Sequence, residues 1–259
     1  DTRMTKFFLR RLLVDVDDKN VYKAYQMDNQ EFPFGFEFVK TAKLREINFG
    51  EMDNQGTPLW VNGEEAVRKG FTICKHCGMV QSGKKANHSF SCIVKRHPDA
   101  PEAQHALQQA MYLYREFSTE VLRLLIPATT EDSDRVRTES FTAAFMLGMK
   151  EYFGNVDHLS ATISEVPCHD SAYRKQYLVI YDSVPGGTGY LKQIVEDESL
   201  LVTIFQKALD VMEHCSCNND PEKDGCYRCL YAYRQSQHMG DISRKAAVHM
   251  LKVILSGKD

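Results

Sequence analysis

The sequence predicts an α+β fold in which a mixed sheet carries flanking helices. Aromatic residues occupy alternate positions of FPFGFEFVK at 32–40, the pattern of a half-buried strand. Further along, apolar residues recur with the 3.6-residue period of a helix. Seven of the eight cysteines gather in two short clusters, which indicates two small metal-binding lobes on this framework. A chain of 259 residues is long enough to bury a substantial core.

The first hundred residues are predicted to be rich in strands. LREINFG at 44–50 and PLWVNG at 58–63 each end at a glycine, as strands that enter turns often do. After Asp99 the pattern becomes helical, and we expect a helix that ends before Pro127. The apolar positions that predict this helix are Leu107, Ala110, Tyr114, Phe117, Val121 and Leu124. The chain is therefore expected to divide into a strand-rich segment with a zinc knuckle at 1–100 and a helical and sheet zinc-binding domain at 101–259, packed as one unit.

The second half has clearer element signals. A helix is expected over 138–152, followed by strands at 159–167 and 175–182. The second of these strands is a continuous apolar run, which is typical of a buried central strand. A glycine-rich turn then opens a short helix, a longer helix follows at about 198–213, and a last helix begins after Asp241 or Ser243.

Composition narrows the classes of partner. The net charge is −3, so contacts with nucleic acid must come from local basic patches. No apolar run approaches the roughly 18 residues that a membrane span needs, so we expect a cytoplasmic protein without a membrane partner. Because the chain starts at Asp1, we expect it to be a piece of a longer polypeptide or a processed product.

The stronger metal signal lies in HCSCNNDPEKDGCYRCLYAYRQSQ at 214–237. Cys215, Cys217, Cys226 and Cys229 form a C-x-C pair and a C-x-x-C pair on either side of a polar, turn-rich loop. Such pairs can converge on one tetrahedral zinc ion, and a shell of four thiolates leaves no open position for catalysis. The alternative, buried apolar thiols, is disfavoured by the polar surroundings. The sequence therefore predicts a structural zinc site.

A second cluster lies in FTICKHCGMVQSGKKANHSFSCIVKRH at 71–97. Cys74 and Cys77 form a C-x-x-C knuckle that is followed by a glycine. We predict a second zinc ion here, although Cys92 could instead be a core residue beside an empty knuckle. The predicted ligands are Cys74, Cys77, Cys92 and His97, with His88 and His76 as rival fourth ligands.

The same cluster contains a near-match to a phosphate-binding loop. Gly78 and Gly83 precede Lys84 and Lys85, but the Ser or Thr that would bind magnesium is missing. The chain alone is therefore not expected to hydrolyse ATP, and we assign no catalytic residue. Lys84 and Lys85 are instead candidate nucleic-acid contacts within a local positive patch.

The glycine-rich turn at 182–189 allows two interpretations. Asp182, Gly186, Gly187 and Gly189 follow a buried strand and open a helix, an arrangement that can receive a phosphate oxygen. The alternative is a tight turn in which the glycines satisfy positive φ angles. A nuclease or hydrolase that uses Asp182 is a further class of function that this turn allows.

Aromatic and basic residues alternate directly after the third cysteine of the 214–237 segment. Arginine bound to phosphate beside tyrosine stacked on a base is a common contact with nucleic acid. The alternative is that the tyrosines pack around the metal site while the arginines are solvated. The candidate nucleic-acid contacts are Tyr227, Arg228, Tyr231 and Arg234.

Several of these motifs together resemble a known family. TESFTAAFMLGM at 138–149, YLVIYDSVPGGTGYLKQI at 177–194, CSC and GCYRCLYAYRQ at 225–235 are similar to the C-terminal MrfA-type zinc-binding domain, long classed as a domain of unknown function, of superfamily-two DEAD/DEAH-box helicases. FPFGFEF, LREINFG and the knuckle at Cys74 resemble the segment that precedes it in large helicases, including some of phage-defence systems. Tyr227 stands where many members have proline.

The resemblance implies that Cys215, Cys217, Cys226 and Cys229 match the zinc ligands of the family. It also implies an ATP-dependent DNA helicase or translocase whose motor domains would be partners in the same polypeptide or complex. This chain contains no helicase motor motifs, so its implied role is structural and DNA-contacting, on a single strand or a fork. A protein-interaction scaffold that docks onto a motor or partner subunit is the alternative.

Overall fold

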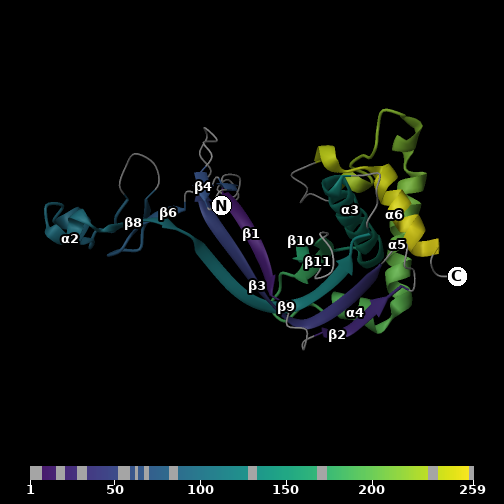
Figure 1. Cartoon of the computed structure of the whole chain (residues 1–259), viewed down its shortest axis with the longest axis horizontal. Helices are drawn as coiled ribbons and strands as arrows, with labels where there is room; N and C mark the ends of the chain where they lie inside the picture. Colours follow the sequence, from purple (N-terminus) through teal and green to yellow (C-terminus); the bar gives the residue numbers. More distant parts are fainter. Residues whose placement is uncertain are drawn as a thin grey trace. The chain divides into compact units, whose positions relative to one another are not determined.

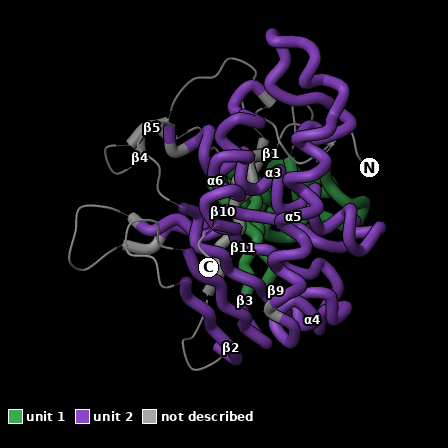
Figure 2. Tube along the Cα trace, turned by 90° about the vertical axis from the view of Figure 1, so that its right-hand side faces the viewer, with its two compact units in different colours: residues 1–13, 44–116 green, residues 14–43, 117–259 purple. Residues whose placement is uncertain are grey.

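The computed structural model describes residues 8–15, 21–27, 34–51, 59–61, 64–66, 70–81, 87–127, 133–167, 174–232 and 239–256. The chain forms two compact units, residues 1–13 with 44–116 and residues 14–43 with 117–259, which Figure 2 colours separately. We call them unit 1 and unit 2. Strands β3 (Gly35–Glu51) and β9 (Leu113–Leu125) contribute residues to both units. A domain boundary at residue 100 therefore stays a prediction.

The predicted α+β class is confirmed. The largest sheet has the strand order β1-β3-β9-β11-β10, and β2 pairs with β3. β11 pairs in antiparallel fashion with β10 and with β9, and β2 pairs in the same way with β3. The strands not yet given bounds are β1 (Phe8–Asp15), β2 (Val21–Gln26), β10 (Leu159–Pro167) and β11 (Arg174–Asp182). The predicted strands at 159–167 and 175–182 are thus present, and the two expected within 32–50 are parts of β3.

The helices of unit 2 and its strands share an apolar core (Figure 1). These helices are α3 (Asp134–Phe153), α4 (Tyr190–Glu196), α5 (Glu198–His214) and α6 (Arg244–Ser256). Apolar periodicity predicts α3, α5 and α6, and the glycine-rich turn predicts α4. Phe205 of α5 lies at the centre, with ring centroids 5.8, 6.0 and 5.9 Å from those of Phe34, Phe141 and Phe145. Such ring pairs stabilise a core beyond their buried area. This core supports the end of α5, from which the cysteine loop starts.

The prediction of one helix between Asp99 and Pro127 is wrong. Only the short α2 (Pro101–Gln104) forms there, followed by strands β8 (Leu107–Met111) and β9. Tyr114, which the helix was to bury, is 65% exposed. Val121 and Leu122 are both fully buried although neighbouring strand residues face opposite sides of a sheet. Strand β9 lies inside the sheet, between β3 and β11, so both of its faces are covered at this point. A short apolar run fits the period of a helix as well as a buried strand, and sheet pairing decides which of the two forms.

Unit 1 contains a small sheet of order β7-β6-β8 and a two-stranded sheet β4-β5. The elements are β4 (Leu59–Val61), β5 (Glu64–Ala66), β6 (Phe71–Cys74), β7 (Val80–Gln81) and the short helix α1 (Ile93–Arg96). A strand within the predicted 58–63 segment is therefore present. Buried Cys74, Cys92 and Ala106 form a small separate cluster. None of the described helices is long and apolar enough to cross a membrane.

Candidate metal centres

The four cysteines of the predicted structural site come together. The ligand atoms of Cys215, Cys217, Cys226 and Cys229 all lie within 4.8 Å of one another. The closest pairs of Sγ atoms are 3.5, 3.7 and 3.8 Å apart, and all four thiols are free of disulfides. A tetrahedral zinc ion with Zn–S bonds of about 2.3 Å separates its sulfurs by about 3.8 Å. The four thiols therefore fit one zinc ion with a closed shell.

The loop that carries these cysteines caps α5. Asn218 lies in the short 3₁₀ helix η3 (Ser216–Asn219), directly after Cys217. Its side-chain amide donates to the carbonyl oxygens of Met212 and Glu213, 3.1 and 2.5 Å away. These carbonyls belong to the last turn of α5, which has no partners for them within the helix. The loop is thereby attached to the end of α5.

The same loop also caps α6. The carboxylate of Asp224 accepts from the hydroxyl of Ser243 and from the backbone N–H of Lys245, at 2.7 and 3.2 Å. The Ser243 hydroxyl in turn accepts from the N–H of Ala246 at 3.2 Å, so Ser243 is the predicted cap. An acidic group at this end of a helix also favours the helix dipole. The loop between the two cysteine pairs is therefore bonded to both helices.

Arg244 connects α6 directly to the metal ligands. Its Nη1 atom donates to Cys217 Sγ at 3.0 Å, and its Nη2 atom donates to the carbonyl oxygen of Lys223 at 3.1 Å. Backbone N–H groups of Cys226 and Arg228 donate to the sulfurs of Cys229 and Cys226, each at 3.3 Å. Donors of this kind stabilise thiolate charge and orient metal ligands. Arg244 and Asp224 were not singled out from the sequence, because their role depends on how α6 packs against the loop.

Burial and the neighbouring groups shift the thiol pKa values of Cys217 and Cys226 in opposite directions. Burial, together with the neighbouring cysteines, raises the pKa of Cys217 to about 12. Burial also acts on Cys226, but the Arg228 N–H and the neighbouring thiols outweigh it and lower the pKa of Cys226 to about 7. Zinc binds thiolates, so its charge would keep all four sulfurs deprotonated at neutral pH.

The second candidate centre lies in unit 1. The ligand atoms of Cys74, Cys77, His88 and Cys92 lie within 4.8 Å of one another. Cys74 and Cys92 have Sγ atoms 3.7 Å apart, and His88 Nδ1 lies 3.6 Å from the sulfurs of both Cys77 and Cys92. Tetrahedral zinc with three sulfurs and one nitrogen requires S···N separations of about 3.6 Å. This set also fits one zinc ion.

The fourth ligand in this set is His88, the rival of His97 in the sequence prediction. His97 is exposed at the end of α1 and is not part of the gathered set. His76 is exposed as well, and its Nε2 atom lies 3.3 Å from the carbonyl oxygen of Glu102. The difference arises because the chain from 87 to 92 returns to the knuckle before α1 begins, which sequence spacing alone does not reveal. The predicted choice of His97 is therefore corrected to His88.

The glycine-rich turn at 182–189 supports the structural alternative to a phosphate site. Asp182 is fully buried, and its carboxylate accepts from the N–H of Val184 and from the N–H and hydroxyl of Thr188, at 2.8, 2.7 and 2.6 Å. The Glu120 carboxylate accepts from the N–H of Gly189 at 3.1 Å. Burial first, then the charge of Asp182, raises the pKa of Glu120. Two carboxylates thus occupy donors that a phosphate would require.

The glycines of this turn meet backbone requirements. Gly186, Gly187 and Gly189 have φ angles of 86°, 79° and 85°, a region that favours glycine. A Cβ atom on Gly187 would also lie 2.4 Å from the side chain of Glu120. The tight turn therefore accounts for all three glycines.

The candidate nucleic-acid residues differ in their surroundings. Tyr227 is 73% exposed, and Arg228 beside it is exposed as well. Tyr231 is half-buried, and its ring lies 3.0 Å from the position that a Cβ atom of Gly225 would take. Tyr231 therefore packs against the cysteine loop. Lys84, Lys85 and Arg234 lie outside the described residues, and their roles stay predictions.

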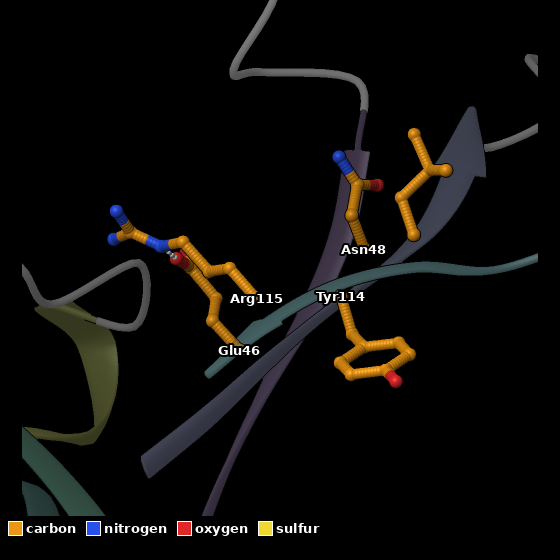
Figure 3. Close-up of a pocket in the computed structure, with 5 residues that line it drawn as sticks. Glu46, Asn48, Tyr114 and Arg115 are labelled. Atoms are coloured by element: carbon orange, nitrogen blue, oxygen red, sulfur yellow. Dashed lines mark hydrogen bonds and ion pairs between the residues drawn. The ribbon is translucent and has the colours of Figure 1, made fainter. Parts of the chain in front are cut away.

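A shallow hollow of about 410 Å³ lies on the strands of unit 1 (Figure 3). Arg115 points toward Glu46 in this view, with Nε and Oε2 only 2.6 Å apart. The guanidinium of Arg45 lies 5.2 Å from the centre of the Tyr114 ring and is paired with Glu116. Because Arg115, the arginine that lines it, is paired, the hollow offers mixed polar and apolar contacts and no concentrated positive charge.

Comparison with known proteins gives a match that contains the four-cysteine site. Residues 141–230 match the family model described as MrfA Zn-binding domain, a range that holds all four cysteines of the first centre. None of the curated proteins matches the chain. A solved structure, the crystal structure of the DUF1998 helicase MrfA bound to DNA, aligns with a TM-score of 0.47 at 11% identity, over 95% of this chain and 26% of that one. The chain thus spans about a quarter of the length of that protein.

Proposed function

We propose, from the premise that residues 141–230 carry an MrfA-type zinc-binding domain, that this chain is the zinc-binding C-terminal domain of an ATP-dependent DNA helicase or translocase. The observation that carries the proposal is the set of four converging thiols inside the matched segment. In this proposal the motor domains belong to the same polypeptide or complex and supply the ATPase activity. The chain itself contributes a rigid, DNA-contacting surface.

The zinc would be structural. A closed shell of four thiolates leaves no position for a substrate or an activated water, so zinc supplies only a fixed crosslink. The residues around it turn that crosslink into a brace, because Asn218 bonds to α5 while Asp224 and Arg244 join the loop to α6. The loop between the two cysteine pairs is thereby held in one conformation.

This brace would present Tyr227 and Arg228 to DNA. Both are exposed directly after Cys226, and the Arg228 N–H donates to the Cys226 sulfur at 3.3 Å. Arg228 forms no ion pair with the carboxylates of the described residues, so its charge is available to a phosphate. An exposed tyrosine next to such a charge suits stacking on a base.

DNA binding by the zinc-loaded chain tests this proposal. Tyr227→Ala with Arg228→Ala should weaken binding to a labelled single strand and to a forked duplex by about tenfold. The dependence of log affinity on log salt should also become shallower by about one unit for the lost phosphate contact. Lys207→Ala, an exposed cation on α5, serves as the matched control and should leave affinity unchanged. Equal affinities for the double variant and the control would rule out DNA contact at this loop.

One observation favours a scaffold role as the second candidate. Three consecutive residues before and within the first half of β9 expose large side chains, namely Tyr112 at 40%, Leu113 at 42% and Tyr114 at 65%. Exposed tyrosines and a leucine beside paired arginines are typical of protein–protein contacts. A chain with this role alone would show no salt-dependent DNA binding, so the titration above separates the two candidates.

A further inference from the structure

The knuckle lobe, which we define as residues 70–106, contains the most exposed of the described large apolar side chains, an aromatic ring. Phe90 is 86% exposed and lies between the metal-set residues His88 and Cys92. The Nζ atom of Lys95 lies 3.9 Å from the centre of its ring, a cation–π contact. One solvated phenylalanine alone would mean little. The positive charge of this lobe and the hydrogen-bonded turn that carries the ring distinguish Phe90 from an isolated exposed side chain.

The ring projects from a short, bonded turn. The N–H of Cys92 donates to the carbonyl oxygen of Ser89 at 3.1 Å, and the hydroxyls of Ser89 and Ser91 lie 3.4 Å apart. Cys92 itself is buried and belongs to the metal set, and the N–H groups of Lys95 and Arg96 both donate to its carbonyl oxygen at 3.0 Å. The turn that carries Phe90 and the backbone of Lys95 and Arg96 are therefore all hydrogen-bonded to Cys92, which is buried.

The cations of this lobe that the structure describes form no ion pairs with described carboxylates. Lys75, Lys95 and Arg96 are exposed, and none of them forms an ion pair with a carboxylate in the part of the chain that the structure describes. The arginines on the strands differ, since Arg115 is paired with Glu46 and Arg123 with Glu37. The lobe thus carries available positive charge in a protein whose net charge is −3.

The charge balance of the lobe remains positive with zinc bound. Its sequence contains five basic residues, Lys75, Lys84, Lys85, Lys95 and Arg96, and two acidic ones, Asp99 and Glu102. Their difference is +3, and three thiolates around one divalent zinc ion add −1. An anionic ligand is therefore favoured.

We infer that the knuckle lobe is a second contact for single-stranded nucleic acid, in which Phe90 stacks on a base while Lys75, Lys95 and Arg96 meet phosphates. A single strand alternates bases and phosphates, so it matches an exposed ring in contact with Lys95, in a lobe whose described cations form no ion pair with described carboxylates. The core of a protein interface is instead depleted of charge, which disfavours a protein partner here. The inference rests on the proposed function only for the class of ligand, because the lobe lies outside residues 141–230 and uses neither Tyr227 nor Arg228.

The test compares two labelled oligonucleotides on the zinc-loaded 259-residue chain: an oligothymidylate of roughly 16 nucleotides and an abasic strand of the same length. Phe90→Ala should weaken binding of the oligothymidylate by about tenfold and leave binding of the abasic strand unchanged, since only a base can stack. Phe90→Trp keeps an aromatic ring and should retain wild-type affinity. Lys95→Gln with Arg96→Gln should weaken both strands and flatten the salt dependence.

Two outcomes would overturn the inference. Phe90→Ala could bind both strands as the wild type does, which would leave the ring to a protein partner, or it could lose affinity for both strands equally, which would exclude stacking. Because Phe90 is exposed, zinc content and melting temperature should not change, and measuring them excludes misfolding. In the Tyr227 and Arg228 variant, the effect of Phe90→Ala should persist, so failure of the cysteine-loop contact and failure of this inference are distinguishable.

Discussion

At the scale of single residues, Arg244 links the last helix to the four-cysteine centre. Arg244→Ala removes a charge-assisted donor from the Cys217 sulfur, which lies 3.0 Å from Nη1. Losses of such supporting contacts weaken metal affinity by about 10–100-fold. We therefore expect a competing chelator to remove zinc from Arg244→Ala at a chelator concentration at least about tenfold lower than the wild type requires. Chelator competition followed by an optical zinc indicator measures this change.

Lys245→Ala is the matched control for Arg244→Ala. The Lys245 side chain is exposed, and only its backbone N–H contacts Asp224. That contact survives the substitution, so zinc retention should equal that of the wild type. If Arg244→Ala and Lys245→Ala released zinc alike, the guanidinium would have no role at the metal centre.

Residue identity and spacing predicted the ligand sets only in part. The C-x-C and C-x-x-C pairs of the first centre are separated by one turn-rich loop, so their convergence follows from local sequence. In the second centre, His88 and His97 were both compatible with the spacing, and only the folded path of residues 87–92 selects His88. Arg244 could not be predicted, since it reaches Cys217 through the packing of α6.

At the scale of elements, the close approach of α3 and α5 depends on Gly148. A Cβ atom there would lie 2.3 Å from the carbonyl oxygen of Ile204 and 2.9 Å from its Cγ2 atom. Alanine favours a helix by about 1 kcal/mol over glycine, but overpacking costs about 1–3 kcal/mol and the contacted atom belongs to the backbone. We expect Gly148→Ala to lower the free energy of unfolding by about 1–2 kcal/mol, measured by urea titration.

Lys150→Ala, on the exposed side of α3, is the control for this helix contact. It should change the free energy of unfolding by no more than about 0.5 kcal/mol. A Gly148→Ala protein as stable as the control would show that α3 and α5 do not need this close approach.

Elements were predicted best where an apolar pattern had one interpretation. The helices α3, α5 and α6 have stripes long enough to exclude strands, and the structure contains all three. Strand β9 was missed because VLRLLI at 121–126 fits either a helix or a buried strand. Pairing with β11, which is distant in sequence, decides between a helix and a strand, and the local sequence does not predict this pairing.

At the scale of the whole molecule, each compact unit contains one of the two candidate zinc centres that the described residues form. The centre of unit 2 braces two helices. The centre of unit 1 organises a lobe with little apolar core, in which Cys74, Cys92 and Ala106 form one small buried cluster and Phe71 is also buried. Structural zinc sites contribute on the order of 10 kcal/mol to folding, so each unit should depend on its own metal. DNA contacts at the two centres would then be separable by mutation.

The most direct test is the zinc content of the purified chain by mass spectrometry, together with its thermal midpoint. The wild type should hold two zinc ions, one for each gathered set. Cys226→Ser should hold one and melt lower by about 10 °C or more. Cys168→Ser, at a cysteine that the sequence places in neither cluster, should keep both ions. If Cys226→Ser kept its zinc content and its midpoint, the four-cysteine brace would be contradicted.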